Sequence, residues 1–149
     1  GCLRRPVSGQ DAVVLQLPIR PATAVLIIDD NPDLLQLFRR YLAGGAYHVL
    51  TASDGAQALA LAQEHQPNAI TLDVMMPSQD GWEILQTLKQ LPSTRDIPVI
   101  VCSVLRERTL ALNLGAHQFL VKPVSQQALL AALADCLQTR HSTAHRAQP

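Results

Sequence analysis

Five polar residues stand where short apolar runs of the sequence end: Asp29, Asp30, Asp73, Ser103 and Lys122. Three carboxylates held together repel one another, and all three ionise at low cost only beside a cation. Oxygen ligands of this kind suit Mg²⁺, which keeps several waters and shares the oxygens of a substrate phosphate. An aspartate can accept a phosphoryl group, and a lysine and a serine hydroxyl can both bind its oxygens. These residue types therefore indicate metal-assisted phosphoryl chemistry.

Each of these residues has a simpler interpretation when it is taken alone. Tandem acids such as Asp29 and Asp30 are often helix caps or solvated turn residues. Asp73 precedes a proline-containing loop and would ordinarily be a turn former, and a lone lysine is usually a surface charge. These interpretations do not predict that four of five apolar runs end in groups that complement one another. The joint pattern therefore favours one shared site.

The apolar runs are expected to be strands, over residues 25–29, 47–52, 69–73, 97–103 and 117–122. A capping residue or helical spacing of apolar residues follows each run, which predicts helices over about 32–42, 53–64, 84–91, 107–114 and 129–137. Five repeats of strand then helix predict an α/β fold, a doubly wound five-stranded parallel sheet with right-handed crossovers. Ligands of such folds bind beyond the carboxyl ends of the strands, which is where the polar residues are expected.

The composition suits one domain without a strong electrostatic partner. The chain has 149 residues, 48% of them hydrophobic, and its formal net charge is zero. That balance argues against a non-specific grip on nucleic acid or on an anionic membrane. The sequence holds no P-loop or GxGxxG motif. Its three cysteines fit no zinc or CxxC pattern, so reduced thiols in a cytoplasmic protein are expected.

Both ends of the chain are expected to lie outside the domain. Residues 1–22 combine several prolines with one short apolar run, VVLQL, and are interpreted as a linker or as the remnant of a preceding domain. The domain itself is expected over 23–138, and the polar residues 139–149 are expected to be a disordered tail. Ends of this length cannot form a DNA-binding domain, so direct nucleic-acid binding by this chain is not expected.

The segments LIIDDN, TLDVMMPSQDG, VIVCS and FLVKP together resemble the receiver domain of two-component response regulators, the CheY-like family. The resemblance covers about residues 24–138, and the spacings 73 − 29 = 44 and 103 − 73 = 30 agree with that family. It implies a flavodoxin-like (βα)5 fold with strand order 2-1-3-4-5. It also implies a signalling module that assists its own phosphorylation and is not a turnover enzyme.

The resemblance implies a role for each residue of the site. Asp73 resembles the phosphoacceptor, which takes a phosphoryl group from a phosphohistidine on a partner protein. Asp30 and Asp73 resemble direct Mg²⁺ ligands, joined by the backbone carbonyl of Met75, and Asp29 resembles a ligand that acts through water. Lys122 resembles the lysine that contacts the acceptor carboxylate and the phosphoryl group.

Further positions resemble those that bind the phosphoryl group and respond to it. The groups implied to bind phosphoryl oxygens are Val74, Val104, Ser103 and Lys122. Ser103 and Phe119 resemble the hydroxyl and the aromatic residue that switch together when the new charge arrives. The peptide bond between Lys122 and Pro123 is expected to be cis.

The implied partners are a sensor histidine kinase or a histidine phosphotransfer protein, and a downstream effector protein or domain. The fourth helix, fifth strand and fifth helix would form the readout face and a possible homodimer interface, and no membrane partner is expected. Two other functions remain open. One is a pseudo-receiver that signals without phosphate, and the other is a Mg²⁺-dependent phosphohydrolase, which would need a general acid where Met75 stands.

Three features depart from the family's usual pattern. Val104 follows the switch hydroxyl where a small residue is usual, and it is expected to narrow access to Asp73. The stretch 103–115 is about one helical turn shorter than usual, so a truncated fourth helix is expected. Met75 and Leu105 are apolar at positions from which a polar side chain could orient an attacking water, which predicts a slowly hydrolysing aspartyl-phosphate.

Overall fold

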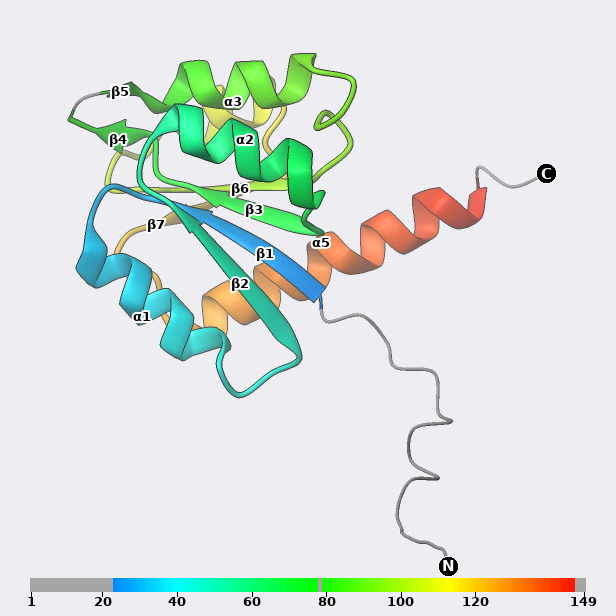
Figure 1. The fold of residues 1–149 in the computed structure, drawn as a ribbon, viewed down its shortest axis with the longest axis horizontal. Coiled ribbons are helices and arrows are strands. Elements are labelled where there is room, and N and C mark those ends of the chain that lie inside the picture. The colour runs from blue at the N-terminus through cyan, green and yellow to red at the C-terminus, as the bar shows by residue number, and fades with distance from the viewer. Residues whose placement is uncertain (1–22, 78, 147–149) are drawn as a thin grey trace, which may run out of the picture.

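The computed structural model describes residues 23–77 and 79–146, which form three layers with a sheet in the middle (Figure 1). The strands of this sheet are β1 (Thr23–Ile28), β2 (Tyr47–Ala52), β3 (Ala69–Leu72), β6 (Val99–Ser103) and β7 (Gln118–Val121). Neighbouring strands are parallel, and their order is β2-β1-β3-β6-β7. This order confirms the doubly wound α/β fold with strand order 2-1-3-4-5, counted over these five strands.

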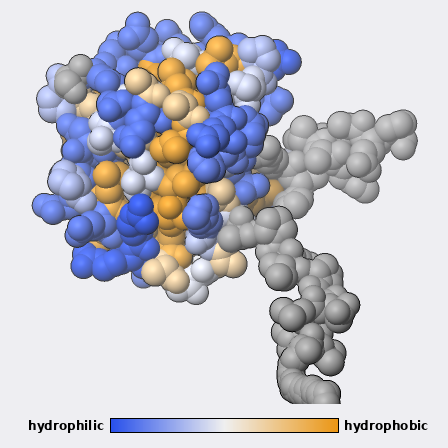
Figure 2. Space-filling view, viewed as in Figure 1, coloured by the Kyte–Doolittle hydropathy of each residue, from blue (hydrophilic) through white to orange (hydrophobic). Residues whose placement is uncertain are grey.

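The inner strands are apolar because helices cover both of their faces. Every residue of β3 and β6 is buried, as is β1 from Val25 onward. A continuous apolar run is the pattern expected for burial on two sides. At one edge of the sheet, β2 has a single fully buried residue, Ala52. Figure 2, drawn in the view of Figure 1, shows a face of the molecule that is mostly hydrophilic, with a narrow band of hydrophobic residues through its middle.

The helices of the described chain are α1 (Pro32–Leu42), α2 (Gly55–His65), α3 (Gly81–Gln90), α4 (Arg108–Asn113) and α5 (Gln126–Arg146). The side chains of Asn31, Asp54 and Asp80 cap the first three by accepting a backbone N–H of the first turn. α4 has six residues, and the φ of +105° at Gly115 after it suits glycine. The short fourth helix expected from the sequence is therefore confirmed.

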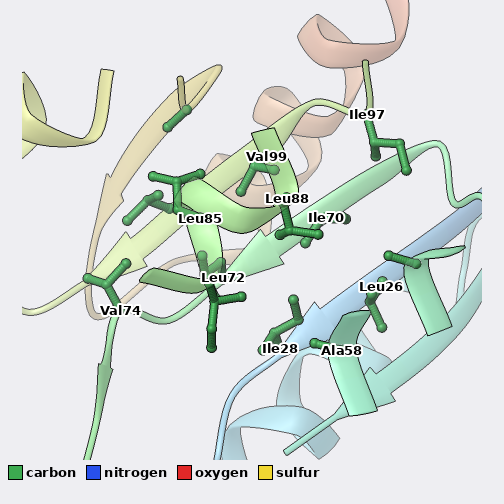
Figure 3. Close-up of a cluster of buried hydrophobic side chains, with 14 of the residues drawn as sticks. Leu26, Ile28, Ala58, Ile70, Leu72, Val74, Leu85, Leu88, Ile97 and Val99 are labelled. Atoms are coloured by element: carbon green, nitrogen blue, oxygen red, sulfur yellow. The ribbon is translucent and has the colours of Figure 1, made fainter. Parts of the chain in front are cut away.

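Two hydrophobic clusters hold the helices against the two faces of the sheet. One joins Ala58 of α2 and Leu88 of α3 to the buried side chains of β1, β3 and β6 (Figure 3). The other joins Phe38 of α1 and Leu129 of α5 to the opposite face. Burial of each large aliphatic or aromatic side chain contributes roughly 1.5–3 kcal/mol before the entropy of ordering is subtracted. The two clusters therefore fix the strands whose ends form the site.

A small antiparallel hairpin lies in the loop after β3, and the sequence did not predict it. β4 (Met75–Met76) pairs with β5 (Gln79–Asp80), with Met75 opposite Asp80 and Met76 opposite Gln79. Strands of two residues are too short to carry a periodic pattern. The hairpin matters for the site because it begins two residues after Asp73.

The last helix continues beyond the domain end expected at residue 138. Residues 139–146 are helical, so the expectation of a disordered tail is wrong for them. No proline or glycine interrupts the segment from Gln126 to Arg146. The polar composition of residues 139–146 is compatible with helix as well as with disorder. Residues 147–149, and the expected linker over 1–22, lie outside the described residues. Within the described residues, no helix is both long and apolar enough to cross a membrane.

Candidate functional site

Four strands end side by side at one edge of the sheet, as parallel strands in register must. The backbone N–H of Asp73 donates to the carbonyl oxygen of Ile28 at 3.0 Å, and that of Lys122 donates to the carbonyl oxygen of Ser103 at 2.9 Å. Asp29 follows β1 directly. The structure therefore brings the strand-ending acids, the hydroxyl and the lysine to one edge, as the sequence predicted.

Lys122 connects two buried carboxylates. Its Nζ lies 2.8 Å from Asp29 Oδ2 and 3.3 Å from Asp73 Oδ2, and the two aspartate side chains are only 2% and 6% exposed. Burial of the ammonium group lowers the pKa of Lys122, but hydrogen bonds and charge attraction, first from Asp29 and then from Asp73, together outweigh it and raise the pKa overall. Lys122 is therefore charged at neutral pH and offsets part of the negative charge of the site.

The three aspartates form a cluster that suits a hard divalent cation. One carboxylate oxygen from each of Asp29, Asp30 and Asp73 lies within 4.8 Å of the other two. Lys122 pairs with two of them, whereas Asp30 has no ion pair within the part of the chain that the structure describes. Asp30 is also the most exposed of the three. An excess of negative charge, an all-oxygen donor set and one solvent-facing carboxylate fit Mg²⁺.

Backbone donors from two residues further on orient Asp73 and Ser103. The N–H of Met75 donates to Asp73 Oδ1 at 2.9 Å, and the N–H of Leu105 donates to Ser103 Oγ at 3.1 Å. Asp73 therefore has one oxygen held by its own loop and the other facing Lys122. No hydrogen bond joins the hydroxyl of Ser103 to Asp73 among the described residues, although both lie at the same edge.

Gly81 lets the chain return from the hairpin closely past the residue next to Asp73. A Cβ at position 81 would lie 2.2 Å from the Cα of Val74 and 2.8 Å from its carbonyl carbon and oxygen. No side chain fits there unless the backbone of Val74 moves. The sequence indicated only that residues 77–81 turn the chain into α3, and the glycine that opens this helix was the one signal of a close approach.

An open hollow of about 340 Å³ lies beside the loop that follows Asp73. Its lining residues are Val74, Met75, Met76, Pro77, Gln79, Asp80 and Trp82. Because Trp82 is the one tryptophan of the chain, its fluorescence is a specific probe of this region. The hollow was not predicted, since the hairpin that shapes it was not.

The other predicted residues differ in burial. Phe119 is 3% exposed and belongs to the hydrophobic cluster that also contains α2 and α3, so its ring is directed into the core. Val104 is 62% exposed and Met75 is 47% exposed. The peptide bond between Lys122 and Pro123 is cis, as predicted. The narrowing of the site by Val104 stays a prediction.

Cys102 is the thiol that lies nearest in sequence to the site, and it is a core residue. It is 2% exposed, and burial chiefly raises its pKa to about 12. The thiol is therefore protonated at neutral pH and is not a nucleophile. Cys102 is therefore no candidate for the chemistry of this edge.

Residues 25–134 match the model of the response regulator receiver domain family. The chain belongs to this family. The receiver domain is similar to the transcriptional regulatory protein PrrA of Mycobacterium bovis, with 39% identity over 123 residues, and to the response regulator PleD of Caulobacter vibrioides, with 40% identity over 110 residues. The matches cover 80% and 72% of this chain but 52% and 24% of the relatives. The chain thus spans about half the length of PrrA and about a quarter of PleD.

Among solved structures, the receiver domain is similar to the chemotaxis response regulator CheY4 of Vibrio cholerae. The TM-score is 0.72 at 30% sequence identity, and the match covers 77% of this chain and 98% of CheY4. The CheY-like fold that the sequence motifs predicted is therefore confirmed. The aspartates, the hydroxyl and the lysine all lie inside the matched residues 25–134.

Proposed function

We propose that this receiver domain accepts a phosphoryl group on Asp73 from a phosphohistidine of a partner protein and then signals through a protein-interaction surface. The observation that carries the proposal is the contact between Lys122 Nζ and Asp73 Oδ2, at 3.3 Å, beside a cluster of three carboxylates. A nucleophilic carboxylate next to a fixed cation, with negative charge left over for a metal ion, is arranged to stabilise a transferring phosphoryl group.

In the proposed reaction, a carboxylate oxygen of Asp73 attacks the phosphorus of the donor in line with the leaving group. A P–O bond forms as the P–N bond to the donor imidazole breaks, and the electron pair of that bond returns to the ring nitrogen, which takes a proton from solvent. Lys122 already lies beside Asp73 and offsets the charge of the transferring group. Further donors proposed for the phosphoryl oxygens are the Ser103 hydroxyl and the backbone N–H groups of Val74 and Val104.

The residues proposed to hold Mg²⁺ directly are Asp30, Asp73 and, through its backbone carbonyl, Met75, with Asp29 acting through water. When bound, the ion neutralises charge on the transferring phosphoryl group. Asp30 suits this role because its charge has no partner within the described residues. Met75 suits it because the hydrogen bond from its N–H to Asp73 Oδ1 holds the residue next to the aspartate cluster.

The proposed switch consists of Ser103 and Phe119. A phosphoryl group on Asp73 adds charge to an edge that is already acidic, and the fully buried Ser103 hydroxyl is the nearby group able to turn and donate to it. Ser103 of β6 pairs with Val121 of β7, and Val121 lies two residues after Phe119 in the same strand. A movement at Ser103 is thereby proposed to bias the packing of Phe119, which this structure shows buried.

The proposed readout surface comprises α4, β7 and α5. It exposes Leu110 and Leu112 of α4 and Val121 at the end of β7, by 38%, 41% and 38%. Exposed apolar side chains of this kind favour a protein partner, here a downstream effector or a second copy in a homodimer. The proposed phosphodonor is a sensor histidine kinase or a histidine phosphotransfer protein, and the domain is proposed to signal rather than to turn over substrate.

Incubation with acetyl phosphate and Mg²⁺, followed by measurement of the intact mass, tests the proposal. We expect one phosphoryl group on the wild-type protein, and none on Asp73→Asn or on wild-type protein kept in EDTA. Absence of the adduct, together with failure to bind beryllofluoride, would contradict the proposal and favour a pseudo-receiver. Continuous release of phosphate from a monoester would instead indicate a phosphohydrolase, which the apolar Met75 two residues after Asp73 argues against.

A further inference from the structure

Gln79 of the hairpin caps a helix to which it is not adjacent in sequence. Its Oε1 accepts a hydrogen bond from the backbone N–H of Gly55, the first residue of α2. The N–H groups of a first helical turn have no partner within the helix. The local cap, Asp54, accepts from Gln57 instead, at 2.8 Å. The N–H of Gly55 is therefore satisfied by a side chain that comes from the loop after Asp73.

The absence of a side chain at Gly55 makes room for this hydrogen bond. A Cβ at position 55 would lie 2.7 Å from Gln79 Oε1 and 3.2 Å from two carbons of Ile84. Gly55 itself is buried, so its N–H would have poor access to water if Gln79 withdrew. The two residues thus form a matched pair in which the glycine leaves the space that the amide side chain uses.

The same hairpin carries the backbone carbonyl proposed to bind the metal ion. Gln79 lies opposite Met76, and Met75 lies opposite Asp80. On the other side, the N–H of Met75 is bonded to Asp73 Oδ1. Met75 is thus held between the aspartate and the strand that Gln79 ties to α2. Apart from the Gln79 bond, the hairpin is held by the burial of Met76 in the cluster with α2 and α3 and by the close approach of Gly81 to Val74.

We propose that Gln79 is a positioning residue for metal binding: its bond to α2 fixes the hairpin so that the Met75 carbonyl stays in reach of the cation at the aspartate cluster. The inference rests on the metal site of the proposed function. A ligand held in place before the cation arrives loses less freedom on binding, so its release weakens binding even though no ligand has been removed. Within the described residues, Gln79 has no hydrogen bond to the aspartates of the cluster, and it is proposed to act through Met75.

Gln79→Met removes the acceptor while keeping a side chain of similar length. The matched control is Gln57→Met, because Gln57 Oε1 also accepts a backbone N–H near the start of α2, from Ser53 at 3.0 Å. Its hydrogen bonds within the described residues go to Ser53 and Asp54 and not to the hairpin. Thermal unfolding of each protein in EDTA reports its stability, and the rise of Tm with Mg²⁺ concentration reports the Kd for the ion. We expect Gln79→Met to raise this Kd about three- to tenfold and Gln57→Met to change it less than about twofold.

Gly55→Ala supplies a second, independent way of expelling the Gln79 side chain. We expect it to raise the Kd for Mg²⁺ by a similar factor. The Kd of the double variant Gly55→Ala/Gln79→Met should be no higher than the higher Kd of the two single variants, since both substitutions remove the same bond. Multiplying effects in the double variant, or an unchanged Kd in Gln79→Met while the wild-type protein binds Mg²⁺, would overturn the role of Gln79 and leave the proposed function standing. Absence of any Mg²⁺-dependent rise of Tm in the wild-type protein would overturn both.

Discussion

Asp30 carries the charge that we expect to destabilise the metal-free receiver domain most. Lys122 pairs with Asp29 and with Asp73, whereas Asp30 faces both aspartates without an ion pair within the described residues. The substitution Asp30→Asn keeps the shape of the side chain and removes its charge. We therefore expect Asp30→Asn to be more stable than the wild-type protein when no divalent cation is present.

The size of the effect follows from the spacing of the carboxylates. Two unit charges at 4.8 Å, the outer limit of the cluster, repel by about 0.9 kcal/mol in water and by about 3.5 kcal/mol at the effective dielectric constant of a protein surface. Lys122 offsets roughly one of the two charges that Asp30 faces, which leaves a repulsion of about one unit charge. Because Asp30 is partly exposed, we expect the free energy of unfolding to rise by about 1–2 kcal/mol.

Urea unfolding in EDTA and in Mg²⁺ measures both parts of this prediction. Mg²⁺ at ten times its Kd stabilises the wild-type protein by about 1.4 kcal/mol, and Asp30→Asn should lose most of this gain. The difference in free energy of unfolding between Asp30→Asn and the wild-type protein is therefore expected to shrink or change sign when the ion is added. Glu64→Gln is the control for net charge, because Glu64 is 72% exposed and lies at the end of α2 away from the site. We expect it to change neither the stability in EDTA nor the gain in Mg²⁺.

Three results would refute the reasoning about Asp30. A lower free energy of unfolding for Asp30→Asn in EDTA would mean that the carboxylates do not repel one another as their spacing requires. An undiminished gain in stability on adding Mg²⁺ would mean that Asp30 is not a ligand. Equal behaviour of Asp30→Asn and Glu64→Gln would show that the effect belongs to net charge rather than to the cluster.

Three further predictions test other parts of the site. Lys122→Met should lower the free energy of unfolding by about 3 kcal/mol at pH 7, because it leaves two buried carboxylates without their cation. Since the pKa of Lys122 is raised above its ordinary value of 10.5, urea unfolding should give the same difference from pH 7 to about pH 10, and the difference should be lost as the pH rises further. Loss of the difference between pH 7 and about pH 10 would contradict the ion pairing. The aspartyl-phosphate of the wild-type protein should persist for minutes or longer after removal of the donor, because Met75 and Leu105 cannot orient a water. Polar replacements such as Met75→Asn with Leu105→Glu should shorten its lifetime about tenfold or more. A wild-type half-life of seconds, measured by loss of label, would count against this. Gly81→Ala should destabilise the domain by about 2 kcal/mol and slow its phosphorylation by acetyl phosphate, because the new Cβ forces the backbone of Val74 to move. An unchanged rate of phosphorylation would argue against the close approach of position 81 to Val74.

The edge that carries the site could be predicted because the relevant information is local. A run such as AITL is mostly apolar because both of its faces are covered, and the residue after a buried strand must emerge at the edge of the sheet. Asp29, Asp73 and Lys122 could therefore be assigned to one edge from their places in the sequence alone. That one ammonium group reaches both carboxylates depends on the packing of β7 beside β6, which no pattern in the sequence specifies.

What the sequence did not predict depends on contacts between distant residues or on segments with ambiguous composition. The bond between Gln79 and Gly55 spans 24 positions, and each residue alone looks like an ordinary loop residue. The approach of Gly81 to Val74 is steric and has no periodic signature. The end of α5 was misjudged because the polar residues after 138 are moderate helix formers that also suit a disordered tail.

The central claim is that Asp73 is the residue that carries the phosphoryl group. Reduction of the phosphorylated protein with borohydride converts an aspartyl-phosphate into homoserine, and tandem mass spectrometry then locates the converted residue. We predict homoserine at position 73 in protein treated with acetyl phosphate and Mg²⁺, and unchanged aspartate at positions 29 and 30. Homoserine at either of those positions, or an unchanged Asp73 in protein whose intact mass shows a phosphoryl group, would contradict the claim.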